Sequence, residues 1–76
     1  MLIYIKTLSG DKKEKDFDPD KQISDLKKLI SETEMVSTKH IRLINSGRIL
    51  KDSQTLAHYK ILPGDTLHMT IHLRGG

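Results

Sequence analysis

The sequence contains neither cysteine nor tryptophan, and its aromatic residues are limited to one phenylalanine and two tyrosines. Without cysteine, the chain has no disulfide, no thiolate ligand for a metal and no cysteine nucleophile. It also lacks an apolar run of membrane-spanning length, and its amino terminus lacks the basic, apolar and small-residue segments of a secretory signal. These absences predict a protein of the cytoplasm and nucleus that makes no contact with membranes.

The excess of charge of one sign is small. The formal net charge is +3, and acidic residues alternate with lysines between positions 11 and 21. Surfaces that bind nucleic acid usually combine clustered basic residues with stacking aromatic side chains. The aromatic residues here, Tyr4, Phe17 and Tyr59, are far apart in the sequence. We therefore expect no binding to nucleic acid.

Catalytic and metal-binding motifs are absent as well. The sequence has no nucleophile elbow, no glycine-rich phosphate loop and no catalytic-metal motif, so we expect no enzymatic activity and no cofactor. His68 and His72 have the spacing of a helical metal pair, but on a strand their Cα atoms would lie roughly 13 Å apart. Without a third ligand nearby, these histidines are predicted to lie on the surface and to bind no metal.

The patterns that are present describe one small folded domain of 76 residues, 36% of them hydrophobic and 30% charged. The clearest pattern, between positions 66 and 73, is a strict alternation that predicts a strand with one face in the core. Its apolar members are Leu67, Met69, Ile71 and Leu73. Strands are also predicted at 1–7, 12–17, 40–45 and 48–50. The strand at 12–17 is the least favourable, because four of its six residues are Lys or Glu.

One helix is predicted between these strands, ending near Glu34. Its apolar residues at helical spacing are Ile23, Leu26, Leu29 and Ile30. Turns are expected at Gly10, at 45–47, and at Pro63-Gly64, which suits the centre of a type II turn. This order of elements predicts an α+β domain in which the helix packs on one face of a mixed sheet.

One apolar residue interrupts the predicted outer face of that sheet. Ile44 shares this face with His40 and Arg42, while the intervening residues point to the core. If this strand adjoins the last one, Ile44, His68 and Thr70 share one exposed area, as in a partner-binding patch with a polar rim. The alternative is that Ile44 is an isolated exposed apolar residue, which is common in soluble proteins.

The last two residues, Gly75 and Gly76, follow directly on the clearest strand. They have no side chains to contribute to a core, so the sequence predicts a thin and mobile thread. Such a thread is either a frayed end or a functional one. A Gly-Gly carboxylate would fit a narrow tunnel in another protein, and its unhindered carbonyl would be open to attack once activated.

Over its whole length the chain resembles the ubiquitin family. The matching segments are Lys6-Thr7-Leu8 with Gly10, parts of 41–44 and 46–47, Thr55-Leu56, Thr66-Leu67-His68 and Leu73-Arg74-Gly75-Gly76. The resemblance implies the β-grasp fold for residues 1–72 and a flexible conjugation tail at 73–76. It also implies a partner-binding patch formed by Leu8, Ile44, Gly47, His68 and Thr70, in which Thr70 replaces the family's usual aliphatic residue.

Within the family, Met1-Leu2-Ile3 and residues 57–62 resemble the neddylation modifier, which is attached to cullins. The resemblance implies that an activating enzyme adenylates the Gly76 carboxylate with ATP and then holds it as a thioester. Conjugating and ligase enzymes would transfer it to a lysine of a target protein such as a cullin, and deconjugating proteases would release it. The free protein is expected to be a monomer.

The resemblance also assigns roles to single residues. Arg42, His72 and Arg74 are expected to contact the activating enzyme. Ubiquitin has arginine at the position of His72 and the neddylation modifier has alanine, so His72 matches neither. Of the lysines on which ubiquitin builds chains, Lys6 and Lys27 are present, whereas the other positions hold Asp11, Leu29, Thr33, Arg48 and Pro63.

Lys60 is a further possible acceptor. Two alternatives remain open: a divergent ubiquitin with few chain-forming lysines, and a β-grasp binding module that is not conjugated.

The exit from the helix also departs from the family, since Met35, Ser37 and Thr38 replace its glycine and prolines. A non-glycine residue with positive φ would cost about 1 kcal/mol, so we expect either a rearranged loop or a less stable domain.

Overall fold

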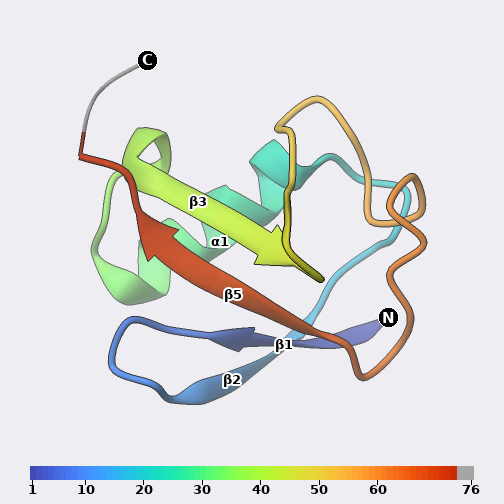
Figure 1. Ribbon diagram of the computed structural model, residues 1–76, viewed down its shortest axis with the longest axis horizontal. Helices are drawn as coiled ribbons and strands as arrows, with labels where there is room; N and C mark the ends of the chain where they lie inside the picture. Colours follow the sequence, from blue (N-terminus) through green and yellow to red (C-terminus); the bar gives the residue numbers. More distant parts are fainter. Residues whose placement is uncertain (74–76) are drawn as a thin grey trace.

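Five strands form one mixed sheet in the order β2-β1-β5-β3-β4, and a single helix packs on one of its faces (Figure 1). The computed structural model describes residues 1–73. Its elements are β1 (Leu2–Lys6), β2 (Lys12–Asp16), α1 (Ile23–Glu34), the 3-10 helix η1 (Thr38–His40), β3 (Ile41–Asn45), β4 (Arg48–Ile49) and β5 (Thr66–Ile71). β1 and β5 are parallel, and the other neighbouring strands are antiparallel. This is the predicted β-grasp architecture.

The core lies between the inner face of the sheet and α1. On β1 and β5 alternate side chains are buried, as the pattern predicted, except that Ile71 at the end of β5 is half-buried. Burial of one such Ile or Leu side chain stabilises the fold by about 1.5–3 kcal/mol. The buried apolar residues are Ile3, Ile5, Phe17, Ile23, Leu26, Ile30, Ile41, Leu43, Leu50, Leu56, Tyr59, Ile61, Leu67 and Met69.

Two residues of the predicted apolar faces lie differently. Leu73 was expected to continue the core face of the last strand, but β5 ends at Ile71 and Leu73 is 81% exposed. Leu29 belongs to the apolar stripe of the helix by spacing, yet it is 39% exposed, at the edge of the interface. In both cases the row of apolar side chains continues beyond the part of the element that its neighbours bury.

Turns at two glycines place the central strands. The hairpin between β1 and β2 turns at Gly10, which has a φ of +92°, and closes with a 2.8 Å bond from the Thr7 amide to the Asp11 carbonyl. Gly64 has a φ of +88° in the predicted type II turn, which the Asp65 amide closes by donating to the Leu62 carbonyl at 3.0 Å. The Gly64 amide also donates to the Leu2 carbonyl at 2.8 Å, so this turn delivers the chain into β5 beside β1.

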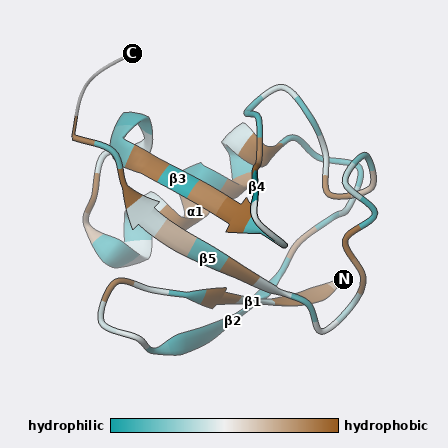
Figure 2. Cartoon of the chain, in the orientation of Figure 1, coloured by the Kyte–Doolittle hydropathy of each residue, from teal (hydrophilic) through white to brown (hydrophobic). Residues whose placement is uncertain are grey.

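The edge strand β2 is hydrophilic along its length (Figure 2). It forms despite its poor propensity because its backbone pairs with all five residues of β1. Ion pairs support its two ends: Lys13 contacts Glu34 of α1 at 2.6 Å, and the amino terminus contacts Asp16 at 2.9 Å. Lysines on an exposed edge also disfavour pairing with a strand of another molecule.

No helix within residues 1–73 combines the length and the apolar character that crossing a membrane requires.

The residue that ends α1 has a left-handed backbone conformation although it is not a glycine. Met35 has φ 57° and ψ 37°, and its amide donates to the Ser31 carbonyl at 3.0 Å. Of the two outcomes expected for this loop, the turn therefore retains its conformation and carries the steric cost. Because Met35 is 88% exposed, its side chain contributes little packing in return.

Replacing Met35 with glycine is therefore expected to raise the free energy of unfolding by about 1 kcal/mol, since glycine adopts positive φ without steric cost. Urea denaturation followed by circular dichroism would measure this as a higher midpoint at constant slope. Met35→Ala is the matched control, because it removes the exposed side chain and keeps the strain. A Met35→Gly variant no more stable than the parent would contradict the assignment.

Candidate functional site

The pairing of β3 with β5 brings the predicted patch residues together. Ile44 lies opposite His68, and Arg42 lies opposite Thr70. The intervening residues Leu43 and Met69 are buried, so the four side chains occupy the face of the sheet that points away from α1. The expected adjacency of the two strands is therefore confirmed.

A second isoleucine joins this surface from β4. Ile49 lies directly opposite Ile44 and is 54% exposed, and such cross-strand pairs share one face with Cβ atoms about 4.5–5.5 Å apart. We call Ile44, Ile49, His68 and Thr70 the sheet patch. Ile49 was missed from the sequence because β4 has only two residues and shows no alternation.

The sheet patch has an apolar centre and a basic rim. Lys6 of β1 lies beside His68, and Arg42 lies beside Thr70. An apolar centre surrounded by polar groups is the usual composition of a protein-binding surface. Thr70 is half-buried and places a hydroxyl where an aliphatic side chain would extend the apolar centre.

The remaining two predicted patch residues lie in turns. Leu8 is 59% exposed in the hairpin between β1 and β2, two residues beyond Lys6. Gly47 directly precedes β4, in the turn that joins β3 to β4, with a φ of +77°. Both are exposed, and each extends from a strand that contributes to the sheet patch or its rim.

Arg42 and His72 form one hydrogen-bonded pair at the end of β5. Arg42 Nη2 lies 3.1 Å from His72 Nδ1, and the His72 amide donates to the His40 carbonyl at 2.6 Å. A guanidinium group can only donate, so Nδ1 must accept and carry no proton. Two of the three residues expected to meet an activating enzyme are thus joined, while Arg74, Gly75 and Gly76 lie outside the described residues.

The three candidate acceptor lysines differ in accessibility. Lys6 and Lys60 are exposed. The Lys27 side chain is only 11% exposed, and its Nζ contacts Asp52 Oδ1 at 2.6 Å. An amine held in this way can attack an acyl group only after the ion pair opens, so Lys6 and Lys60 are the better acceptors.

Arg48, where ubiquitin has a lysine, is held by the chain around Tyr59. Its Nη2 donates to the Tyr59 carbonyl at 3.0 Å, and its guanidinium lies 5.3 Å from the centre of the Tyr59 ring. The Tyr59 hydroxyl in turn accepts a 2.8 Å bond from the Lys51 amide. Arg48 thus stabilises the loop after β4, and its guanidinium cannot act as an acceptor at neutral pH.

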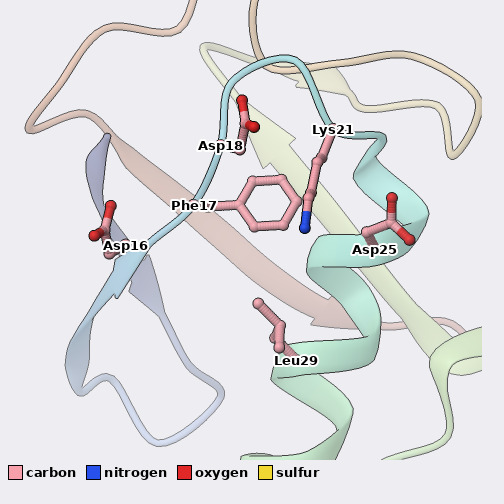
Figure 3. Close-up of a pocket in the computed structure, with 6 residues that line it drawn as sticks. All are labelled: Asp16, Phe17, Asp18, Lys21, Asp25 and Leu29. Atoms are coloured by element: carbon pink, nitrogen blue, oxygen red, sulfur yellow. The ribbon is translucent and has the colours of Figure 1, made fainter.

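Residues 1–73 contain no group of three His, Asp or Glu side chains placed to bind a metal ion. A hollow of about 300 Å³ between β2 and α1 is lined by Asp16, Phe17, Asp18, Lys21, Asp25 and Leu29 (Figure 3). Two of its three carboxylates have close partners, since Asp16 binds the amino terminus and Asp18 accepts from the Asp20 amide at 2.9 Å. The lining includes no nucleophile paired with a base, and we assign no chemistry to it.

Comparison with known proteins places this geometry in context. A model of the ubiquitin family matches residues 3–74. The chain is 38% identical over 76 residues to the ubiquitin-like protein NEDD8 of Dictyostelium discoideum, an alignment that covers all of this chain and 99% of that protein. It is 37% identical over 76 residues to ubiquitin-like protein 1 of Schizosaccharomyces pombe, with 100% and 97% covered.

The NEDD8-like protein RUB3 of Arabidopsis thaliana is 35% identical over 80 aligned residues, which cover all of this chain and 97% of that protein. The similarity to these relatives therefore extends over both the strands that carry the sheet patch and the segment around His72.

The burial of Lys27 predicts its chemical reactivity. With a limiting amount of an acetylating reagent, we expect Lys27 to react about tenfold more slowly than Lys60 or slower still, because its covered amine must first leave the ion pair with Asp52. Mass spectrometry of digested protein would measure the rates. Asp52→Asn should accelerate labelling of Lys27 and leave Lys60 unchanged. Equal rates at the two lysines in the parent protein would contradict this geometry.

The Arg42–His72 bond predicts a single tautomer of the His72 ring. Long-range ¹H–¹⁵N NMR at pH 7.5 should show an unprotonated Nδ1 and a protonated Nε2, because the arginine occupies Nδ1. Exposed His68 serves as the internal reference for a ring without this partner. In an Arg42→Ala variant, the His72 signals should move toward those of His68. A proton on Nδ1 in the parent protein would refute the bond.

Proposed function

Because this chain belongs to the ubiquitin family, we propose that it is a ubiquitin-like modifier of the neddylation type, joined by an isopeptide bond to lysines of target proteins such as cullins. The observation that carries the proposal is the similarity to NEDD8-like relatives along the whole chain. The segment Leu73-Arg74-Gly75-Gly76 carries the glycine carboxylate that such a reaction needs. We further propose that the protein acts in the cytoplasm and nucleus.

The proposed chemistry takes place at the Gly76 carboxylate. An activating enzyme transfers AMP from ATP to the carboxylate and releases pyrophosphate, which makes the carbonyl electrophilic. A cysteine thiolate of that enzyme then displaces AMP to form a thioester. After transfer to a conjugating enzyme, a target lysine amine displaces the thiolate and forms the isopeptide bond. This chain contributes the carboxylate and the surfaces on which the enzymes dock.

The Arg42–His72 pair favours the neddylation type over ubiquitin. His72 Nδ1 lies 3.1 Å from Arg42 Nη2, so the imidazole is turned toward the guanidinium. Ubiquitin has an arginine at the position of His72, which is a permanent cation, whereas an imidazole sets no fixed second cation beside Arg42. In this respect the surface that meets the activating enzyme is closer to that of the neddylation modifier, which has alanine there.

The sheet patch and the acceptor lysines complete the proposal. Ile44 and Ile49 offer ligases, deconjugating proteases and other readers an apolar centre, and Lys6 and Arg42 provide its rim. Of the lysines at positions where ubiquitin builds chains, only Lys6 is readily accessible, since Lys27 is held by Asp52. This favours attachment as a single copy over the building of long chains.

The test is thioester formation with ATP and either the ubiquitin or the neddylation activating enzyme of the same organism, read on non-reducing gels. We expect a thioester with the neddylation enzyme that a reducing agent cleaves. His72→Ala should retain this reaction. His72→Arg should weaken it by about tenfold or more, because it sets a second fixed cation beside Arg42.

The alternative functions predict different thioester products on these gels. A thioester with the ubiquitin enzyme alone would identify a divergent ubiquitin. No thioester with either enzyme, when mass spectrometry shows Gly76 intact, would sink the proposal and favour a binding module that is not conjugated.

A further inference from the structure

A basic hollow of about 200 Å³ lies on the helix side of the molecule. It is lined by Ser24, Lys27, Lys28, Thr38, Lys39 and Asp52, which come from α1, η1 and the loop after β4. Three lysines and one aspartate leave a charge of +2 among these side chains. The sheet patch lies on the opposite face of the sheet from α1, so the two surfaces are separate.

The positive charge of this basic hollow resides on two of its lysines. Lys27 is neutralised by Asp52 at 2.6 Å, and this pair occupies the only carboxylate among the lining residues. The Nζ of Lys28 lies 3.9 Å from Asp25, and both side chains are exposed, so that contact contributes little. Lys39 forms no ion pair within residues 1–73.

The backbone segments that carry these lysines are fixed by hydrogen bonds. Backbone bonds from Ile23 to the Gln54 carbonyl at 2.8 Å and from Ser24 to the Asp52 carbonyl at 3.1 Å fix the loop to the first turn of α1. On the other side, η1 is closed by a 2.9 Å bond from the His40 amide to the Ser37 carbonyl, and it packs against α1. Like charges gathered on a rigid surface repel one another, and an anion between them relieves that repulsion.

We propose that the basic hollow binds clustered carboxylates of an acidic segment in a protein partner. Lysine ammonium groups act as point charges that attract carboxylates as well as phosphate, and the lining contains no arginine whose planar fork would bind phosphate in a bidentate way. It also contains no aromatic side chain on which a nucleotide base could stack, and no apolar residue that could enter a membrane. Binding at this site does not require Gly76, so this proposal is tested independently of conjugation.

The test is an NMR titration of the ¹⁵N-labelled full chain with an end-blocked hexaglutamate peptide, with hexaglutamine as the uncharged control. We expect saturable shifts confined to amides of residues 24–28, 38–40 and 52. These shifts should disappear in about 1 M salt, where the Debye length is about 3 Å. Hexaglutamine should cause none.

Two double variants with the same net charge separate this site from general attraction. K28Q/K39Q removes the two lysines of the basic hollow that Asp52 does not neutralise, and we expect it to weaken binding by about tenfold. K12Q/K60Q removes two exposed lysines that do not line the basic hollow and should bind like the parent. Spectra of the free variants establish that each is folded.

Three results would overturn the inference. Equal losses in the two double variants would show attraction by net charge alone. Shifts centred on Arg42 and His68 would place the acidic segment on the sheet patch rim. Stronger binding of inorganic phosphate than of hexaglutamate at the basic hollow would assign it to phosphate. The thioester assay is unaffected by any of these outcomes.

Discussion

The parallel pairing of β5 with β1 is the interaction on which the rest of the structure depends. It joins residues 66–68 to residues 4–6, across almost the whole length of the chain. Only when β5 occupies this central position can β3 and β4 attach to its other edge. The same strand supplies Leu67 and Met69 to the core and His68 and Thr70 to the outer face. One strand therefore positions both the core and the candidate site, and its pairing with β1 must overcome the entropy of closing a long loop.

A domain of this size has little stability to spare, yet it retains strained backbone at its turns. Met35, Ser46 and Lys60 have φ values of 57°, 51° and 57°, and a left-handed residue other than glycine costs roughly 1–2 kcal/mol. These residues stand where the chain must change direction: at the end of α1, between β3 and β4, and before the buried Ile61. The buried contacts on either side outweigh the strain, because each buried Ile or Leu contributes a comparable or larger amount.

The sequence predicts this fold well wherever one pattern repeats over several residues. The alternation along β5 and the spacing of Ile23, Leu26 and Ile30 specify buried faces, and Pro63-Gly64 specifies its turn. The prediction of burial is wrong for Leu73 and incomplete for Leu29, because the sequence pattern does not show where the neighbouring elements stop covering the apolar face. Ile49 escapes notice because a strand of two residues has no period.

The Arg42–His72 bond could not be predicted either. It joins side chains 30 positions apart, and it exists only in the register that sets Arg42 opposite Thr70. The resemblance to the ubiquitin family supplies the candidate residues, but the contact between Arg42 and His72 is known only from the geometry.

The single helix explains why so small a protein can present two separate surfaces. A sheet covered by helices on both faces would bury His68 and Ile44 as it buries Leu67 and Leu43. Here α1 covers one face alone, so the outward residues of β1, β3, β4 and β5 remain free to carry an apolar centre and a charged rim (Figure 1). The helix in turn needs only one side for the core, and its outer flank can collect lysines that a second layer would exclude. The fold thus separates two kinds of recognition physically: apolar contact on the bare side of the sheet, and charge on the flank of the helix.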